Sequence, residues 1–208
     1  MARPTPEDLI RAGDLVAEVL APAVTADWTV AAGPLDWDCR RTLDHLPDTL
    51  LLYAGHLACR AERGLPYVRH GEPGISPRRL LGVMTISAHI LAAVAAASPA
   101  ATLAYHPAGF SDAEGFCAMG CDELLVHGAD IAAGLQLPFN PPAELVTPVV
   151  ARLFPAAPAG GDPWTTLLWA NGRATLPGHD RLPPDWSLPR NCDGSGGAVT
   201  ERAQGAGE

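Results

Sequence analysis

The sequence predicts an all-α protein, namely an antiparallel four-helix bundle followed by a short helical or irregular C-terminal extension. Apolar residues recur at intervals of three and four in four long segments, which is the periodicity of helices that bury one face. Helix start and stop signals bound these segments, and linkers of moderate length join them. No segment alternates between apolar and polar residues for long enough to predict a β-strand. Four long helices joined in this way are typical of an antiparallel bundle.

The first two helices have recognisable boundaries. Thr5–Asp8 is a helix start, because the hydroxyl caps free N–H groups, proline suits the first helical position and the acids oppose the helix dipole. This helix is predicted to run for roughly five turns and to end before Gly33-Pro34. The second helix begins near Cys39 and reaches about Arg63, and Pro47 within it predicts a kink or a later start.

The third and fourth helices also begin at capping signals. Ser76-Pro77 opens the third, which is predicted to end at Ala97 ahead of a Ser-Pro pair. Pro99–Gly109 is predicted to be a loop. Ser111–Glu114 is a capping box that opens the fourth helix, and Gly134 is a suitable C-terminal glycine for it.

Two shorter helices follow, one from Asn140–Pro142 to about Phe154 and one from Asp162–Trp164. We expect the tryptophans of this region to attach it to the bundle, namely Trp164, Trp169 and Trp186. The chain is thus predicted to divide into a four-helix bundle, an extension packed on it and a disordered tail rich in glycine, at residues 1–155, 156–190 and 191–208.

Charge and composition narrow the classes of function. The formal net charge of -9 argues against a nucleic-acid partner and against docking on anionic lipid, because both need clustered Lys and Arg. The most apolar stretch, Leu80–Ala97, is interrupted by Thr85, Ser87 and His89, so we interpret it as a buried core helix and not as a membrane span. Five cysteines and no basic-then-apolar N-terminal signal favour a cytoplasmic location.

One pair of residues on the fourth predicted helix has the spacing of metal ligands. Glu123 and His127 are four residues apart, so they share a face with Cβ atoms about 6 Å apart and can reach one ion. His45, on the second helix, is the best candidate for a third ligand. Imidazole and carboxylate together suit zinc, nickel or iron better than magnesium or calcium. Spacing alone leaves the alternatives open, namely a solvated Glu–His pair and a core histidine.

Two longer motifs contain these residues. Trp37–Leu46 resembles the W-x5-L-x-H-L signature of the DinB-like, mycothiol-dependent maleylpyruvate isomerase superfamily. Glu123–Ala132 resembles its second signature, E-[LV]-x-V-H-G-x-D-[LI]-A. Leu167–Arg173 is similar to the C-terminal stretch of short actinobacterial members. The chain differs from the pattern at Ala129, where the family often has tryptophan, and it has too few residues after Pro155 for the isomerase's C-terminal domain.

The resemblance implies a DinB-like bundle that binds one divalent ion, zinc or nickel, through His45, Glu123 and His127. It implies an enzyme with mycothiol as cosubstrate, in which the metal activates the thiolate to attack an electrophilic small molecule. The reaction would be an S-transfer or an isomerisation. Family members often pair, so the resemblance also implies a homodimer.

Three other residues are candidates near the site. Asp130 follows His127 by three residues and either orients that ligand by accepting its other N–H or simply caps or is solvated. His56 is about 16 Å along the helix axis from His45, too far to share the ion, and either lines the mouth of the pocket to move protons or is structural. Arg40 either binds an anionic substrate or cofactor or pairs with a nearby acid.

Other functions compete with the thiol-dependent enzyme. The same metal could activate water for hydrolysis, or act as a Lewis acid in a biosynthetic cyclisation or elimination. A non-catalytic metal-binding stress or sensor protein is the third alternative, and it would need a fourth protein ligand. Cys117 and Cys121, four residues apart, are either a soft-metal or redox pair or small buried residues.

Overall fold

The computed structural model describes residues 3–69, 71–72 and 74–182. Over these residues the chain is mostly helical, with six α-helices that pack together, one short 3₁₀ helix and one two-stranded antiparallel hairpin. The elements in chain order are α1 (Pro6–Leu20), η1 (Ala21–Ala23), α2 (Cys39–Cys59), α3 (Pro77–Ala97), β1 (Ala104–His106), β2 (Gly109–Ser111), α4 (Ala113–Gly134), α5 (Ala143–Leu153) and α6 (Pro163–Ala170).

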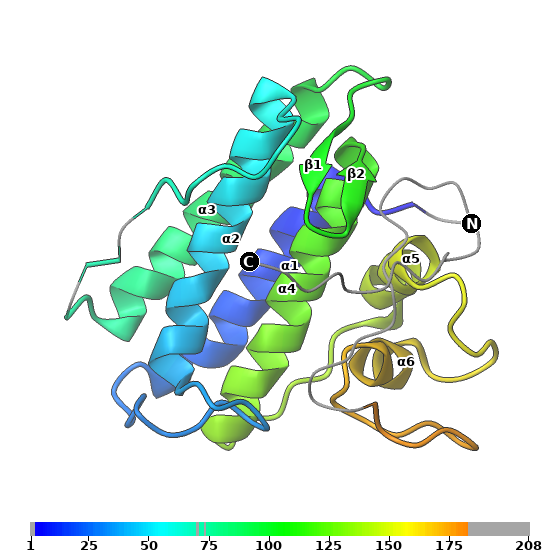
Figure 1. Cartoon of the computed structure of the whole chain (residues 1–208). Helices are drawn as coiled ribbons and strands as arrows, with labels where there is room; N and C mark the ends of the chain where they lie inside the picture. The colour runs from blue at the N-terminus through cyan, green and yellow to red at the C-terminus, as the bar shows by residue number, and fades with distance from the viewer. Residues whose placement is uncertain (1–2, 70, 73, 183–208) are drawn as a thin grey trace, which may run out of the picture.

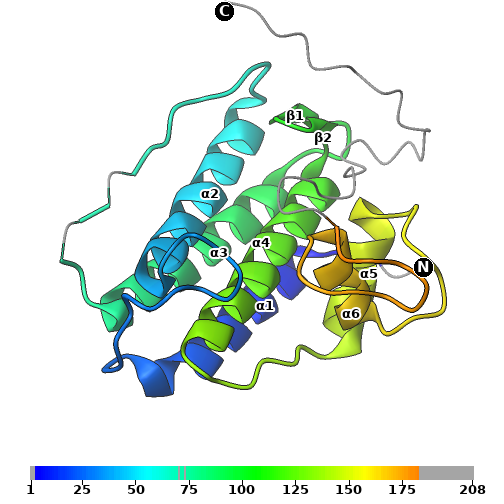
Figure 2. The same cartoon turned by 60° about the horizontal axis from the view of Figure 1, so that its bottom comes forward.

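The four long helices α1 to α4 lie side by side, and α5 and α6 lie together against α4 (Figure 1). Turning the molecule shows α2 and α3 on the side away from α5 and α6 (Figure 2). Both α1 and α2 contact α3 and α4, so the buried apolar side chains of all four helices form one continuous core. Trp164 and Trp169 of α6 are buried in the extension of this core, whereas Trp186 and the predicted tail 191–208 lie outside the described residues.

Helix starts follow the predicted caps, with one shift. Thr5 forms a complete capping box with Asp8, and side chains of the same kind cap α2, α3 and α6. The cap of α4, however, is Asp112, whose side chain accepts the Gly115 N–H, and not Ser111. The reason is that the backbone of Ser111 is already part of β2, so the helix can begin only one residue later.

One other boundary, the end of the second helix, differs from the prediction. The second helix begins at Cys39 as predicted and continues through Pro47, so no later start occurs. It ends at Cys59, four residues before Arg63, because Arg60 takes a left-handed conformation (φ 52°). The Ala61 N–H then donates to the His56 carbonyl (2.9 Å), which closes the helix end.

The hairpin lies where a loop was predicted. Its three-residue strands pair Ala104 with Ser111 and His106 with Gly109, and they are too short for an alternating pattern to be visible in the sequence. The Tyr105 N–H donates to the Ala61 carbonyl (2.7 Å), which ties the hairpin to the end of α2. The hairpin therefore sits beside α2 and the start of α4, where it reaches the site described below.

The predicted core helix, α3, buries only one face. Leu80, Met84 and Leu91 are in the core, whereas Ile86 and Ile90 are exposed. By length and composition alone α3 could cross a membrane, and just under half of its most apolar stretch is buried in the protein. Its contacts with α1 and α2 are those of a helix at the edge of a protein core.

Gly134, at the end of α4, lies directly against Ala31 and Cys39, and this close packing generates a prediction about stability. A Cβ at Gly134 would collide with the Ala31 carbonyl oxygen and lie 2.6 Å from the Cys39 Sγ. We expect Gly134→Ala to lower the free energy of unfolding by about 1–3 kcal/mol in urea denaturation. Gly82→Ala, on the exposed face of α3 with nothing within 4 Å, should instead raise it by about 0.5–1 kcal/mol. Equal effects of the two substitutions would contradict this account.

Candidate metal centre

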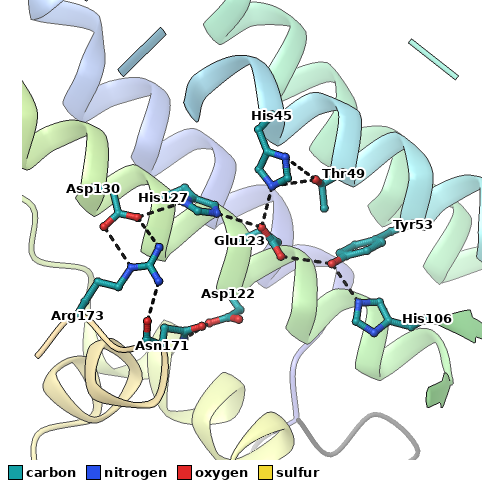
Figure 3. A network of polar contacts seen from close by, with 10 residues as sticks. All are labelled: His45, Thr49, Tyr53, His106, Asp122, Glu123, His127, Asp130, Asn171 and Arg173. Atoms are coloured by element: carbon teal, nitrogen blue, oxygen red, sulfur yellow. Dashed lines mark hydrogen bonds and ion pairs between the residues drawn. The ribbon is translucent and has the colours of Figure 1, made fainter. Parts of the chain in front are cut away.

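Two helices bring together the three residues predicted as metal ligands. His45 projects from α2, and Glu123 and His127 project from one face of α4 (Figure 3). One ligand atom from each side chain lies within 4.8 Å of the other two. The Glu123 Oε2 atom is central, at 3.5 Å from His45 Nε2 and 3.4 Å from His127 Nε2. The structure thus contains a candidate metal site of two imidazoles and one carboxylate.

The distances within this group favour a shared cation. A charge-assisted hydrogen bond would bring an imidazole nitrogen and a carboxylate oxygen to about 2.8 Å. Two ligands that bind a tetrahedral ion at about 2.1 Å are instead about 3.4 Å apart. Glu123 Oε2 lies 3.5 Å from His45 Nε2 and 3.4 Å from His127 Nε2, and these separations match the second arrangement. The residues present therefore fit a divalent ion in both donor type and spacing.

The group is partly enclosed. The exposed fractions of the His45, Glu123 and His127 side chains are 24%, 17% and 16%, so solvent reaches the group without surrounding it. Among the described residues, one group of His, Cys, Asp or Glu side chains has its ligand atoms within 4.8 Å of one another. Its members are His45, Glu123 and His127. Three protein ligands leave coordination positions for a small molecule, as in catalytic zinc sites.

Asp130 contacts His127 and orients its imidazole, which was one of the two roles predicted for Asp130. Its Oδ2 lies 3.1 Å from His127 Nδ1, so the imidazole donates Nδ1–H to this carboxylate and its Nε2 faces Glu123. Arg173, just after α6, holds the buried Asp130 with both Nη2 (2.9 Å) and Nε (3.3 Å). No sequence signal pointed to this role for Arg173, although Arg173 lies within the C-terminal stretch that resembles the family.

The charges around His127 control its protonation when no metal competes for it. Burial lowers the pKa of His127, but interactions with Asp130 and Glu123 raise it by more, to about 9. A metal ion and this proton use the same imidazole, so binding of the ion must release the proton.

Two residues that sequence reasoning missed complete the surroundings of Glu123. The Tyr53 hydroxyl of α2 donates to Glu123 Oε1 (3.3 Å), and His106 Nε2 of β1 lies 3.2 Å from the same hydroxyl. His106 lies in the segment that was predicted to be a loop, but it is only 7% exposed because the hairpin packs it against the helices. Thr49 contacts His45, with its Oγ1 at 3.2 Å from Nε2.

The structure does not bring His56 or Arg40 to this group. His56 is 1% exposed, not at a pocket mouth, and its Nε2 accepts the Leu65 N–H (3.0 Å), so it fastens the loop after α2. Burial also lowers the pKa of His56. The Arg40 guanidinium donates to the Ile75 carbonyl (3.2 Å), so it holds the segment before α3. Within the described ranges 3–69, 71–72 and 74–182 it pairs with no candidate ligand and no acidic side chain.

Cys117 and Cys121 are buried, as one of the two interpretations expected. Burial raises the pKa of the Cys117 thiol to about 12 and that of Cys121 well above its ordinary value. Both thiols are therefore protonated at neutral pH, and a buried thiol is a poor metal ligand or redox group.

Comparisons of the chain with protein-family models, with curated proteins and with solved structures find no match.

The raised pKa of His127 predicts how the metal-free protein responds to pH. Because this pKa is higher in the folded protein than in the unfolded chain, the proton stabilises the fold fully below pH 6.5 and the effect is lost as the pH rises through about 9. With a chelator present, we expect the free energy of unfolding to fall over this range by at most about 3 kcal/mol. Urea denaturation of wild type and His127→Gln measures this decline, which should be absent in the variant. The control His89→Gln, at an exposed site on α3, should retain it.

The Asp130 contact generates a second prediction. Asp130→Ala leaves His127 free to rotate, so we expect metal affinity to fall by about 10–100-fold, measured by calorimetric titration with Zn²⁺. Asp14→Ala removes the same charge from an exposed position on α1 and should leave the affinity unchanged. Equal losses in the two variants would mean that net charge, and not the orientation of His127, governs binding.

Proposed function

We propose that this chain is a divalent-metal-dependent enzyme, a thiol S-transferase or isomerase that uses mycothiol or a similar small thiol. The observation that supports it most is the meeting of His45, Glu123 and His127 at ligand spacing, with access for a further ligand. Zinc is the metal we propose, with nickel as the second choice, because two imidazoles and one carboxylate suit both.

The proposal includes the family. The two signatures that resemble the DinB-like, mycothiol-dependent superfamily occupy α2 and α4, and their His45, Glu123 and His127 face one another. Helices α1 to α4, packed side by side, agree with the antiparallel four-helix bundle of that family, and α5 and α6 are additions to it. A cytoplasmic location and a homodimer are proposed on the resemblance alone.

The side chains have separate tasks in the proposed reaction. A bound divalent ion would lower the pKa of a thiol and supply positive charge for its attack on an electrophilic carbon. Asp130 keeps the proton of His127 on Nδ1, so that Nε2 presents a lone pair toward the site. Arg173 holds Asp130 in place, and the partly enclosed setting limits the access of competing water.

The experiment begins with elemental analysis of the native protein, for which we expect one equivalent of zinc or nickel. Calorimetric titration with mycothiol should then show binding that requires the metal. Conjugation of the thiol to an electrophile should fall to background in His45→Ala and persist in His89→Ala, whose side chain is exposed on α3.

Two results would contradict this proposal in different ways. Full activity of a metal-free preparation would exclude the metal-dependent mechanism. Turnover that needs the metal but no thiol would select a hydrolase, lyase or cyclase at the same site.

A further inference from the structure

A chain of two hydrogen bonds reaches Glu123 from the side opposite to the histidines. Glu123 Oε2 faces His45 and His127, whereas Oε1 accepts the Tyr53 hydroxyl (3.3 Å), which in turn contacts His106 (3.2 Å) (Figure 3). Each oxygen of the carboxylate therefore has a different set of neighbours. The site proposed above uses only the Oε2 side.

The direction of these hydrogen bonds follows from one backbone contact. The Ala108 N–H donates to His106 Nδ1 (3.1 Å), and an amide nitrogen of the backbone can only donate. His106 Nδ1 is therefore the acceptor, and its ring proton resides on Nε2. His106 Nε2–H must then donate to the Tyr53 oxygen, which leaves the single hydroxyl hydrogen of Tyr53 for Glu123 Oε1. Both donors in this series of hydrogen bonds, His106 Nε2–H and the Tyr53 hydroxyl, therefore point toward the Glu123 carboxylate.

We infer that Tyr53 and His106 are positioning residues that hold Glu123 as an anionic ligand with Oε2 directed at His45 and His127. This inference rests on the metal site of the proposed function. The Tyr53 hydroxyl engages Oε1, so rotation of the Glu123 carboxylate away from its present orientation would weaken that hydrogen bond. The donors in series also stabilise its negative charge, which is the form that binds a cation.

The same direction excludes an outward proton path through this pair. A proton that left Glu123 by way of Tyr53 would have to enter His106 at Nε2, which already carries one. Release on the far side would require Nδ1 to give up a proton where the Ala108 N–H points at it. The pair therefore orients the ligand and does not carry protons away from the site.

Packing makes this arrangement rigid. Tyr53 and His106 are both buried, with ring centroids 5.3 Å apart, and both rings contact the Phe116 ring of α4 edge-on, at 5.7 and 6.4 Å. The β1–β2 pairing of His106 with Gly109 sets the backbone position of the imidazole. The hairpin thus has a specific role, which is to place one hydrogen-bond donor behind the metal ligand.

The test is a titration of the chelator-treated protein with Co²⁺, which reports affinity and, through its visible absorption, coordination geometry. Tyr53→Phe removes only the hydroxyl, and we expect about 10–100-fold weaker binding with an altered cobalt spectrum, because Glu123 becomes free to turn. His106→Ala should act in the same direction, and His106→Gln, which keeps a side-chain N–H, should recover part of the loss. The double variant Tyr53→Phe/His106→Ala should lose no more than Tyr53→Phe, because His106 acts through Tyr53.

The matched control is Tyr105→Phe, which removes a hydroxyl from the neighbouring residue of β1, whose side chain points to the other face of the strand. It should bind Co²⁺ as wild type does, with the same spectrum. Circular dichroism identifies any variant that does not fold. If Tyr53→Phe does not fold, the two His106 variants test the positioning role by themselves.

The outcomes separate this inference from the proposal it rests on. Failure of the wild type to bind Co²⁺ would overturn both. Wild-type binding together with unchanged affinity and spectrum in Tyr53→Phe and His106→Ala would overturn the positioning role alone. An equal loss in Tyr105→Phe would also overturn it, because the effect would then be that of any hydroxyl removed from this region.

Discussion

The Glu123 carboxylate sets the register between α2 and α4, because it contacts side chains of both helices through its two oxygens. His45 and Tyr53 are eight residues apart on α2, so they lie on one helix face with about two turns between them. Glu123 Oε2 reaches the first and Oε1 reaches the second. A shift of either helix by one residue would break both contacts at once. The site and the packing of the two helices therefore depend on the same side chain.

Charge balance around this carboxylate explains much of its surroundings. Glu123 and Asp130 bring two negative charges into a partly enclosed space, and Arg173 offsets one of them. The remaining charge is met by a proton on His127, whose pKa is raised for that reason, or by a cation. An ion held by His45, Glu123 and His127 would replace this proton and contact both α2 and α4, so its binding would be coupled to folding.

The parts of the structure that could be predicted are those determined by neighbours in the sequence. Helix starts at Thr5, Asp38 and Asp162 depend on a side chain and a backbone N–H three residues later, and the spacing of Glu123 and His127 lies within one turn. His45 was predicted as a third ligand from its place on the second helix, and the resemblance of its motif to a known family supported that prediction. The prediction of a loop at the hairpin failed, because strands of three residues leave no periodic pattern. Tyr53 and Arg173 could not be found, since they reach their partners across 70 and 43 residues of chain.

The contact of Arg173 with Asp130 has a consequence for how the protein unfolds. Arg173 follows α6, whereas Asp130 is buried in α4 beside His127 of the candidate metal site. Detaching the last two helices would leave that carboxylate buried without its guanidinium, a cost of several kcal/mol for an unpaired ionised group. The C-terminal helices and the long helices should therefore melt in a single cooperative transition. A truncated chain that ends before α6 would retain all three candidate ligands yet hold His127 poorly.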